Sequence, residues 1–291
     1  MVLDGPAVIV ALLTPFDDDG RLDETALREH VDYLVDEGVH GLMPCGSTGE
    51  TALLSDDEVT QVVRATVAAA NGRVPVLAHV GRAGTATTLA LARHALADGA
   101  AAVSAVVPYY YPLSQDQIRA HFGALVEGLP GEDLYAYTVP VNAHNELEPP
   151  LLERLIADGV SGAKDSTKSL ERHREYAAVV RQAGDGFQLF VGTASLVLDS
   201  LREGSAGAVL AIANLRPDLC VRLAHAYAEG REDEGERLQR ELAELEAGLA
   251  REAVLPALKR AVSERLREQR GASFGRELRS PLGTAAVSVP G

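Results

Sequence analysis

The sequence predicts one (β/α)8 barrel followed by a C-terminal helical extension. Short apolar runs alternate with amphipathic segments eight times, and the apolar runs are continuous rather than alternating. Continuous apolar strands separated by helices indicate a parallel sheet covered by helices. Eight such units are the number that closes a barrel, and 291 residues suit one barrel of about 250 residues with an extension. We expect the barrel over residues 1–230 and the extension, packed on it, over residues 231–291.

The apolar runs are the expected strands. No GxGxxG loop follows the first run, which ends in Leu13-Thr14-Pro15-Phe16. An open, doubly wound sheet usually carries such a phosphate-binding loop, so the closed barrel is favoured. The eight expected strands are Ala7–Leu13, Gly41–Pro44, Val74–Val80, Ala102–Val107, Leu134–Tyr137, Val160–Ala163, Gln188–Val191 and Ala206–Leu210.

A segment with helical periodicity follows each run. Ser55-Asp56-Asp57-Glu58 and Ser114-Gln115-Asp116-Gln117 have the pattern of helix N-terminal capping boxes. Glycines that favour helix ends close several segments, at Gly38, Gly72, Gly99, Gly159, Gly204 and Gly230. The expected helices are Asp23–Glu37, Ser55–Ala70, Thr85–Ala97, Ser114–Glu127, Pro149–Ala157, Ser169–Gln182, Thr193–Arg202 and Pro217–Glu229. Beyond them, Glu232–Gln269 has only helical periodicity, and we expect Pro256 to break it.

Composition and charge exclude several classes of protein. Acidic residues outnumber basic ones by 42 to 27, which gives a net charge of −15 and disfavours nucleic acid and anionic membranes as partners. No apolar run reaches membrane-spanning length, and the first residues lack the features of a signal peptide. Two cysteines without metal-ligand spacing, and scattered histidines, predict neither a disulfide framework nor a metal site. We expect a soluble, cytoplasmic protein without a cofactor.

Lysine is rare in this chain. There are 24 arginines and only three lysines, namely Lys164, Lys168 and Lys259. Arginine cannot lose its proton in a protein whereas lysine can, so a retained lysine hints that a primary amine is needed. Lys168 and Lys259 fall in segments that we expect to be helical, and we interpret both as structural or surface residues.

Lys164 is the candidate nucleophile because it falls at the end of the sixth expected strand, where the active sites of (β/α)8 barrels lie. Burial would favour its neutral amine, which can attack a ketone and form a Schiff base. The alternative is a surface lysine paired with Asp165.

Two other strand ends carry candidate groups. The turn Gly46-Ser47-Thr48-Gly49-Glu50 follows the second strand and could aim hydroxyl and N–H groups at a carboxylate or phosphate. The alternative is a tight turn with capping hydroxyls. Tyr137 ends the fifth strand and could transfer protons, or it could simply pack in the barrel. Tyr109-Tyr110-Tyr111 forms an aromatic loop, and His79 is expected to be a hydrogen-bonded core residue.

These residues resemble the dihydrodipicolinate synthase / N-acetylneuraminate lyase family over nearly the whole chain. The matching motifs are Leu13-Thr14-Pro15-Phe16, Gly46-Ser47-Thr48-Gly49-Glu50, Pro108-Tyr109-Tyr110, Tyr137 before Val139-Pro140, Gly162-Ala163-Lys164-Asp165 and Arg279-Ser280-Pro281-Leu282.

The resemblance implies a class I aldolase or related lyase that is a homotetramer. Lys164 would form a Schiff base with pyruvate or another 2-oxo acid, with Tyr137 as the proton shuttle. Ser47 and Thr48 would hold the carboxylate of the 2-oxo acid, and Tyr110 would reach towards a neighbouring subunit's site. Gly192, Leu210 and, more loosely, Asn214 match residues that line the pocket.

The chain departs from the family pattern at three places. Asn142 stands where the synthase branch has an arginine that grips the second substrate's carboxylate, and losing that arginine removes a bidentate site. Gly192 is followed by Thr193-Ala194-Ser195, where the sialic acid lyase branch has acidic residues. Thr138 replaces the usual asparagine after the tyrosine, so the hydrogen bonding there must differ.

We therefore expect a Schiff-base aldolase that forms or cleaves a 4-hydroxy-2-oxo acid such as 2-keto-3-deoxygluconate, and releases pyruvate on cleavage. Alternatives that also use Lys164 are a dehydratase of a deoxy-oxo sugar acid and a dihydrodipicolinate synthase. A different class of function is a non-catalytic barrel that binds a 2-oxo acid.

Overall fold

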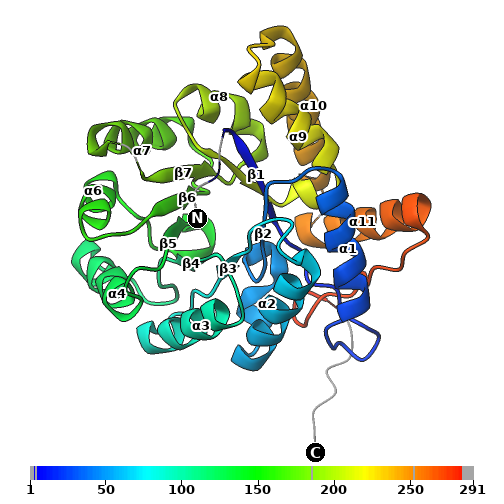
Figure 1. The fold of residues 1–291 in the computed structure, drawn as a ribbon, viewed down its shortest axis with the longest axis horizontal. Coiled ribbons are helices and arrows are strands. Elements are labelled where there is room, and N and C mark those ends of the chain that lie inside the picture. Colours follow the sequence, from blue (N-terminus) through cyan, green and yellow to red (C-terminus); the bar gives the residue numbers. More distant parts are fainter. Residues whose placement is uncertain (1–2, 4, 185, 252, 284–291) are drawn as a thin grey trace, which may run out of the picture.

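The predicted strands form one parallel sheet that closes into a barrel (Figure 1). The computed structural model describes residues 3, 5–184, 186–251 and 253–283. Along the sheet the strands run in the order β2-β1-β8-β7-β6-β5-β4-β3, and a parallel bridge between Leu42 and Val76 joins its two edges. The predicted (β/α)8 barrel is therefore confirmed. The strands are β1 Ala7–Ala11, β2 Gly41–Met43, β3 Leu77–His79, β4 Ala102–Val106, β5 Leu134–Thr138, β6 Gly162–Asp165, β7 Gln188–Val191 and β8 Gly207–Leu210.

Helices surround the barrel, one after each strand (Figure 1). They are α1 Glu24–Asp36, α2 Asp56–Ala70, α3 Thr85–Ala97, α4 Gln115–Gly128, α6 Pro149–Ala157, α7 Leu170–Ala183, α8 Val197–Arg202 and α9 Pro217–Ala228. Both predicted capping boxes are present, at Ser55 and Ser114. The six glycines predicted at helix ends all have positive φ angles, which only glycine adopts without strain. The one-turn helix α5, Pro140–Ala143, was not predicted.

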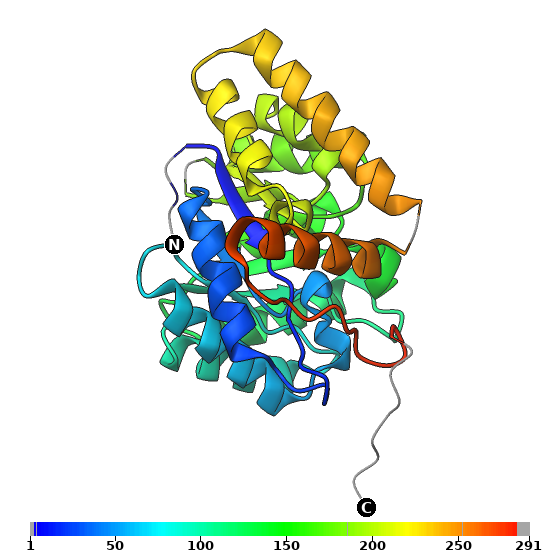
Figure 2. The ribbon, with the colours of Figure 1, turned by 90° about the vertical axis from the view of Figure 1, so that its right-hand side faces the viewer.

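Two helices form the C-terminal extension, α10 over Glu232–Ala250 and α11 over Val254–Arg270. The predicted break in the helical pattern is present, but it lies just before Pro256, because α10 ends at Ala250 and α11 begins at Val254. Pro256 lies in the first turn of α11, where its missing N–H leaves no helical bond unmade. Figure 2 shows both helices against the side of the barrel, where Arg265 donates to the Tyr33 hydroxyl of α1 at 2.7 Å. The division of the chain at residue 230 stays a prediction, and residues 284–291 of the expected extension lie outside the described residues.

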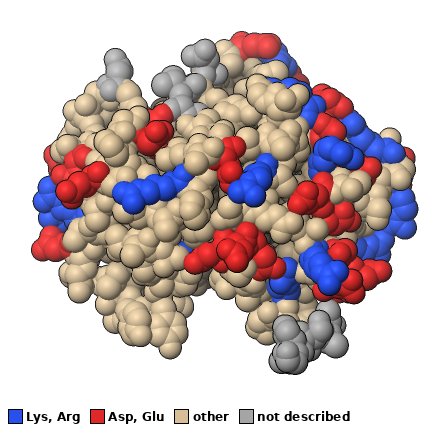
Figure 3. Space-filling view, turned by 60° about the horizontal axis from the view of Figure 1, so that its bottom comes forward, with Lys and Arg blue, Asp and Glu red and all other residues tan. Residues whose placement is uncertain are grey.

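The surface carries intermingled charges. On the face in Figure 3, acidic and basic side chains lie beside one another, mainly on the side where Figure 1 places α1 and α11. Many surface arginines of the described chain form ion pairs, such as Arg270 with Asp36 at 2.8 Å. Among the helices that the structure describes, none combines the length and the apolar character needed to cross a membrane.

Candidate active site

Lys164 has a buried side chain inside the barrel, near the carboxyl end of β6. Only 6% of the residue is exposed. Its Nζ lies 4.2 Å from the centroid of the Tyr137 ring and 3.8 Å from Met43 Sδ. Burial lowers the pKa of Lys164, while the neighbouring Tyr137 opposes this shift. A desolvated amine of this kind has the neutral form that a nucleophile needs.

The alternative interpretation of Lys164, a surface lysine paired with Asp165, is wrong. Asp165 is buried and its carboxylate has other donors. It accepts from the Thr167 N–H at 2.8 Å and from His173 Nδ1 at 2.8 Å. Strand alternation turns the side chains of Lys164 and Asp165 to opposite faces of the sheet, which explains why neighbours in sequence do not pair.

Tyr137 in β5 stands between Lys164 and the turn after β2. Its hydroxyl oxygen is 3.5 Å from Ser47 Oγ, and its ring packs edge-on against His79 with centroids 5.8 Å apart. His79 Nδ1 donates to the Cys45 carbonyl at 2.9 Å, and its Nε2 accepts from the Val106 N–H at 3.3 Å. Burial lowers the pKa of His79 to about 3, so the ring is neutral. His79 is thus the hydrogen-bonded core histidine that we expected, and its ring packs against the ring of Tyr137.

The turn after β2 is held in an unusual backbone conformation. Ser47–Gly49 forms a 3-10 turn that follows Cys45 at φ 59°, and Glu50 after it has φ 62°. A Cβ on Gly49 would lie 3.0 Å from the Leu12 carbonyl oxygen, so a larger residue there would have to shift the turn away from the segment that follows β1. Both hydroxyl residues at the centre of the turn, Ser47 and Thr48, line the pocket described below.

Gly192, which follows β7, leaves room for the Lys164 side chain. A Cβ at this position would lie 2.0 Å from Ser166 Oγ and 3.1 Å from Lys164 Cε. The Gly192 N–H donates to the Asp165 carbonyl at 2.6 Å, which fixes the two strand ends beside each other. The structure therefore places Gly192 beside Lys164.

These residues meet at one pocket of about 610 Å³, a volume typical of small-molecule sites. Lys164 lies beneath it, in contact with Tyr137 and Gly192, which both line it. Helices α10 and α11 form one wall, through small and apolar residues such as Ala247 and Leu258. The extension is thus part of the pocket. The lining also includes Ser47, Thr48, Asn142, Ser166, Lys168, Thr193, Ser195 and Glu246.

Three residues matched by the resemblance do not line the pocket. Leu210 is buried in β8, and the two residues after it line the pocket instead. Asn214 is buried and structural, since its amide donates to the Ala11 carbonyl at 2.7 Å and its Oδ1 accepts from the Leu13 N–H at 3.0 Å. Tyr110 is 79% exposed and contacts the ring of Tyr111, so within its own chain it does not approach Lys164.

Sequence reasoning missed Lys168. The prediction of a helical position is wrong, because α7 begins at Leu170 and Lys168 lies in the preceding loop with φ 62°. It lines the pocket, where it is the one basic residue of the lining that the structure describes. The scarcity of lysine was the signal that could have identified it.

Lys259 is structural, as predicted, but it is completely buried. Its Nζ donates to Glu50 Oε1 at 2.6 Å and to the Glu277 carbonyl at 2.7 Å, and it lies 4.4 Å from the centroid of the Phe16 ring. Glu50 Oε2 accepts from the Arg279 N–H at 2.8 Å. The buried ion pair between Lys259 and Glu50 therefore fixes the extension to the turn that carries Ser47.

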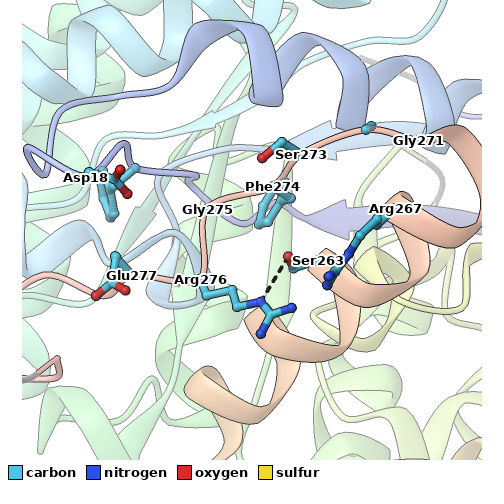
Figure 4. A pocket seen from close by; sticks show the side chains of 11 residues that line it. Asp18, Ser263, Arg267, Gly271, Ser273, Phe274, Gly275, Arg276 and Glu277 are labelled. Atoms are coloured by element: carbon cyan, nitrogen blue, oxygen red, sulfur yellow. Dashed lines mark hydrogen bonds between the residues drawn. The ribbon is translucent and has the colours of Figure 1, made fainter.

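Another hollow, of about 470 Å³, lies between the end of α11 and the loop after β1 (Figure 4). Arg267, Arg276, Asp18 and Glu277 line it, and Arg276 Nε donates to Ser263 Oγ at 3.2 Å. None of the predicted site residues lies there. Across the described part of the chain, no group of three or more His, Cys, Asp or Glu residues is placed to hold a metal ion.

Known proteins resemble this chain in sequence and in fold. The family model of the dihydrodipicolinate synthetase family matches residues 5–288. The 4-hydroxy-tetrahydrodipicolinate synthase of Rhizobium meliloti is 37% identical over 283 residues, which are 96% of this chain and 93% of that protein. An uncharacterized DapA-like lyase of Halobacterium salinarum is 36% identical over 279 residues, covering 94% of this chain and 87% of that protein.

Among solved structures, YagE, a prophage protein of the dihydrodipicolinic acid synthase family from E. coli K12, was determined in complex with pyruvate. It is 25% identical, with a TM-score of 0.90 over 98% of this chain and 94% of that one. The buried amine at the end of β6, the whole-chain match to the family and these likenesses agree. The chain belongs to the dihydrodipicolinate synthetase family and is a class I carbon–carbon lyase that acts through a lysine Schiff base.

Proposed function

We propose that this protein is a pyruvate-dependent aldolase for a 4-hydroxy-2-oxo sugar acid, such as 2-keto-3-deoxygluconate, and that Lys164 forms the Schiff base. The observation that carries the proposal is the buried Lys164 amine beneath a pocket whose lining includes six hydroxyl side chains and one amide. Asn142 is one of the lining residues, at the place where the resemblance implies an arginine for a second carboxylate. Hydroxyl and amide groups suit the hydroxyls of a sugar chain.

In the cleavage direction, the neutral Lys164 amine attacks the C2 carbonyl. Tyr137 donates its hydroxyl proton to the leaving oxygen, so that water leaves and an iminium ion remains. Ser47 and Thr48 hold the C1 carboxylate. The Tyr137 oxygen, which gave its proton to the departing water, takes the proton of the C4 hydroxyl, the C3–C4 bond breaks, and an aldehyde leaves. The electron pair of that bond moves into the iminium as an enamine. Protonation at C3 and hydrolysis then release pyruvate and restore the amine.

Trapping the intermediate tests the role of Lys164. Borohydride added with pyruvate should give a stable adduct on the Lys164 peptide and none in a Lys164→Ala variant. Lys168→Ala is the matched control, because it removes another lysine of the same strand end and should leave the adduct in place. A folded enzyme that gives no adduct on Lys164 would disprove this mechanism.

Product analysis then tests the substrate. Incubation of 2-keto-3-deoxygluconate should release pyruvate and glyceraldehyde in equal amounts, whereas a dehydratase would release neither. The second candidate is 4-hydroxy-tetrahydrodipicolinate synthase, which the name of the Rhizobium meliloti relative favours. Condensation of pyruvate with aspartate semialdehyde that is faster than with glyceraldehyde would favour that candidate over ours.

We also propose a homotetramer, in which Tyr110 reaches towards a neighbouring subunit. Tyr110 and Tyr111 are 79% and 67% exposed and pack against each other, with Tyr110 at φ 82°. Exposed neighbouring aromatic residues favour a contact with another protein surface. Light scattering should give four times the 30.8 kDa chain mass, and Tyr110→Ala should weaken the assembly. A wild-type monomer would refute this.

The two free, buried cysteines support our placing of the enzyme in the reducing cytoplasm.

A further inference from the structure

The loop after β6 places a second amine at the pocket of the proposed Schiff base. Lys168 lies four residues after Lys164, so their Cα atoms are at most about 14 Å apart. Lys168 lines the pocket, and the residue is exposed. Among the described residues of the lining, Glu246 is the one acidic side chain, and it is occupied. Its carboxylate accepts from the N–H groups of Ala194 and Ser195 at 3.2 and 3.0 Å.

The backbone of Lys168 points to a specific role. Its φ of 62° is in the left-handed region, which residues other than glycine and asparagine rarely enter. Within the residues that the structure describes, no acidic side chain forms an ion pair with Lys168, in contrast to the many paired surface arginines. A strained residue that presents an uncompensated charge to a pocket is more consistent with a role in binding than with one in folding.

The barrel topology gives the direction in which a bound substrate extends. In the closed ring of eight strands, β2 and β6 lie opposite each other, so the turn with Ser47 faces the strand with Lys164. At C2 of the Schiff base, the nitrogen, the carboxylate and C3 point in three directions about 120° apart. A carboxylate held at Ser47 and Thr48 therefore sends C3 and the rest of the chain away from that turn. Polar residues after β6 and β7, namely Ser166, Thr193 and Lys168, line the pocket on the other side.

We propose that Lys168 determines specificity for an aldehyde that carries an anionic group, a phosphate or a carboxylate, at the end remote from its carbonyl. This inference rests on the proposed aldolase function and narrows its substrate from the free sugar acid, which would then be the weaker substrate, to a 4-hydroxy-2-oxo acid with an anionic group at the far end of its chain. The Lys168 ammonium pairs with the terminal anion, while the hydroxyl groups of Ser166 and Thr193 contact the carbon chain between. No covalent step involves Lys168. Because its side chain is exposed, the interaction should weaken as ionic strength rises.

The test compares aldehydes of matched skeleton as partners of pyruvate. Glyceraldehyde 3-phosphate and glyceraldehyde differ only in the terminal phosphate, and succinic semialdehyde carries a terminal carboxylate. For Lys168→Met we expect the KM for the anionic aldehyde to rise about 10-fold, the effect of losing one charged hydrogen bond of about 1.4 kcal/mol. The KM for glyceraldehyde should change less than twofold. Lys168→Arg should restore most of the loss, because it retains the charge.

Two controls separate the possible failures. Arg174→Gln removes a positive charge from α7 that pairs with Glu203 at 2.8 Å outside the pocket, and it should leave both KM values unchanged. Borohydride trapping with pyruvate should be unchanged in Lys168→Met. If wild-type enzyme gives no adduct, the proposed function fails. If the adduct forms but Lys168→Met alters all the aldehydes equally, or none, the role of Lys168 is refuted. A selective effect with either the phosphate or the carboxylate supports it and identifies the anion.

Discussion

Removing the Lys259 ammonium should destabilise the protein severely. Neither Lys259 nor Glu50 has any exposed side-chain surface, and their charged atoms are 2.6 Å apart. In Lys259→Met the stem is replaced by a side chain of similar volume, but among the residues that the structure describes Glu50 keeps only the Arg279 N–H as a donor. A buried charge that loses its partner costs about 3–5 kcal/mol. For a protein of this size, that loss lowers the melting temperature by about 10 °C.

Urea unfolding at pH 7, followed by far-UV circular dichroism, measures this loss. The double variant Glu50→Gln with Lys259→Met should recover at least half of it, because no uncompensated charge remains buried and Gln can still accept from Arg279. Lys168→Met is the matched control, since this lysine is exposed and should contribute less than about 0.5 kcal/mol. The reasoning is refuted if Lys259→Met is within 1 kcal/mol of wild type, or if the double variant is no more stable than Lys259→Met.

Three further results are expected. The yield of the borohydride-trapped pyruvate adduct should rise with pH to a midpoint below the ordinary lysine pKa of about 10.4, because burial lowers the pKa of Lys164; an unshifted midpoint would contradict this. Gly192→Ala should lower kcat/KM about 10- to 100-fold by crowding Lys164. Adding Ser166→Ala should restore part of the lost activity. Full activity in the single variant would contradict this, because it would show that the site relaxes around the added methyl group. Burial lowers the pKa of His30 to about 4, so the unfolded chain binds protons below pH 6.5 while the folded chain does not. Unfolding free energy should therefore fall by about 2 kcal/mol between pH 6.5 and 5, at 1.36 kcal/mol per pH unit, and a urea titration of His30→Gln should lack this component.

Local sequence determined the barrel units. The capping boxes at Ser55 and Ser114, the glycines with positive φ after the helices and the continuous apolar strands act over a few residues, so their patterns can be interpreted without tertiary structure. The same holds for the position of Lys164, because strand ends in a (β/α)8 barrel meet at one face. The break between α10 and α11 lies a few residues before Pro256 for a local reason, since proline is tolerated in the first turn of a helix and the pattern alone did not show where that turn begins.

The sequence by itself determined the fold class, the family and the strand ends from which the candidate site is built. Only the tertiary structure decided which polar residues share the pocket. Lys168 was assigned to a helix, yet its loop turns it towards the pocket. Asn214 resembled a pocket residue, yet it bonds β1 to the segment after β8. Lys259 and Glu50 are 209 positions apart, and α10 and α11 supply a wall of the pocket. Such contacts join distant segments, and their geometry depends on how helices pack on the closed barrel, which no local pattern encodes.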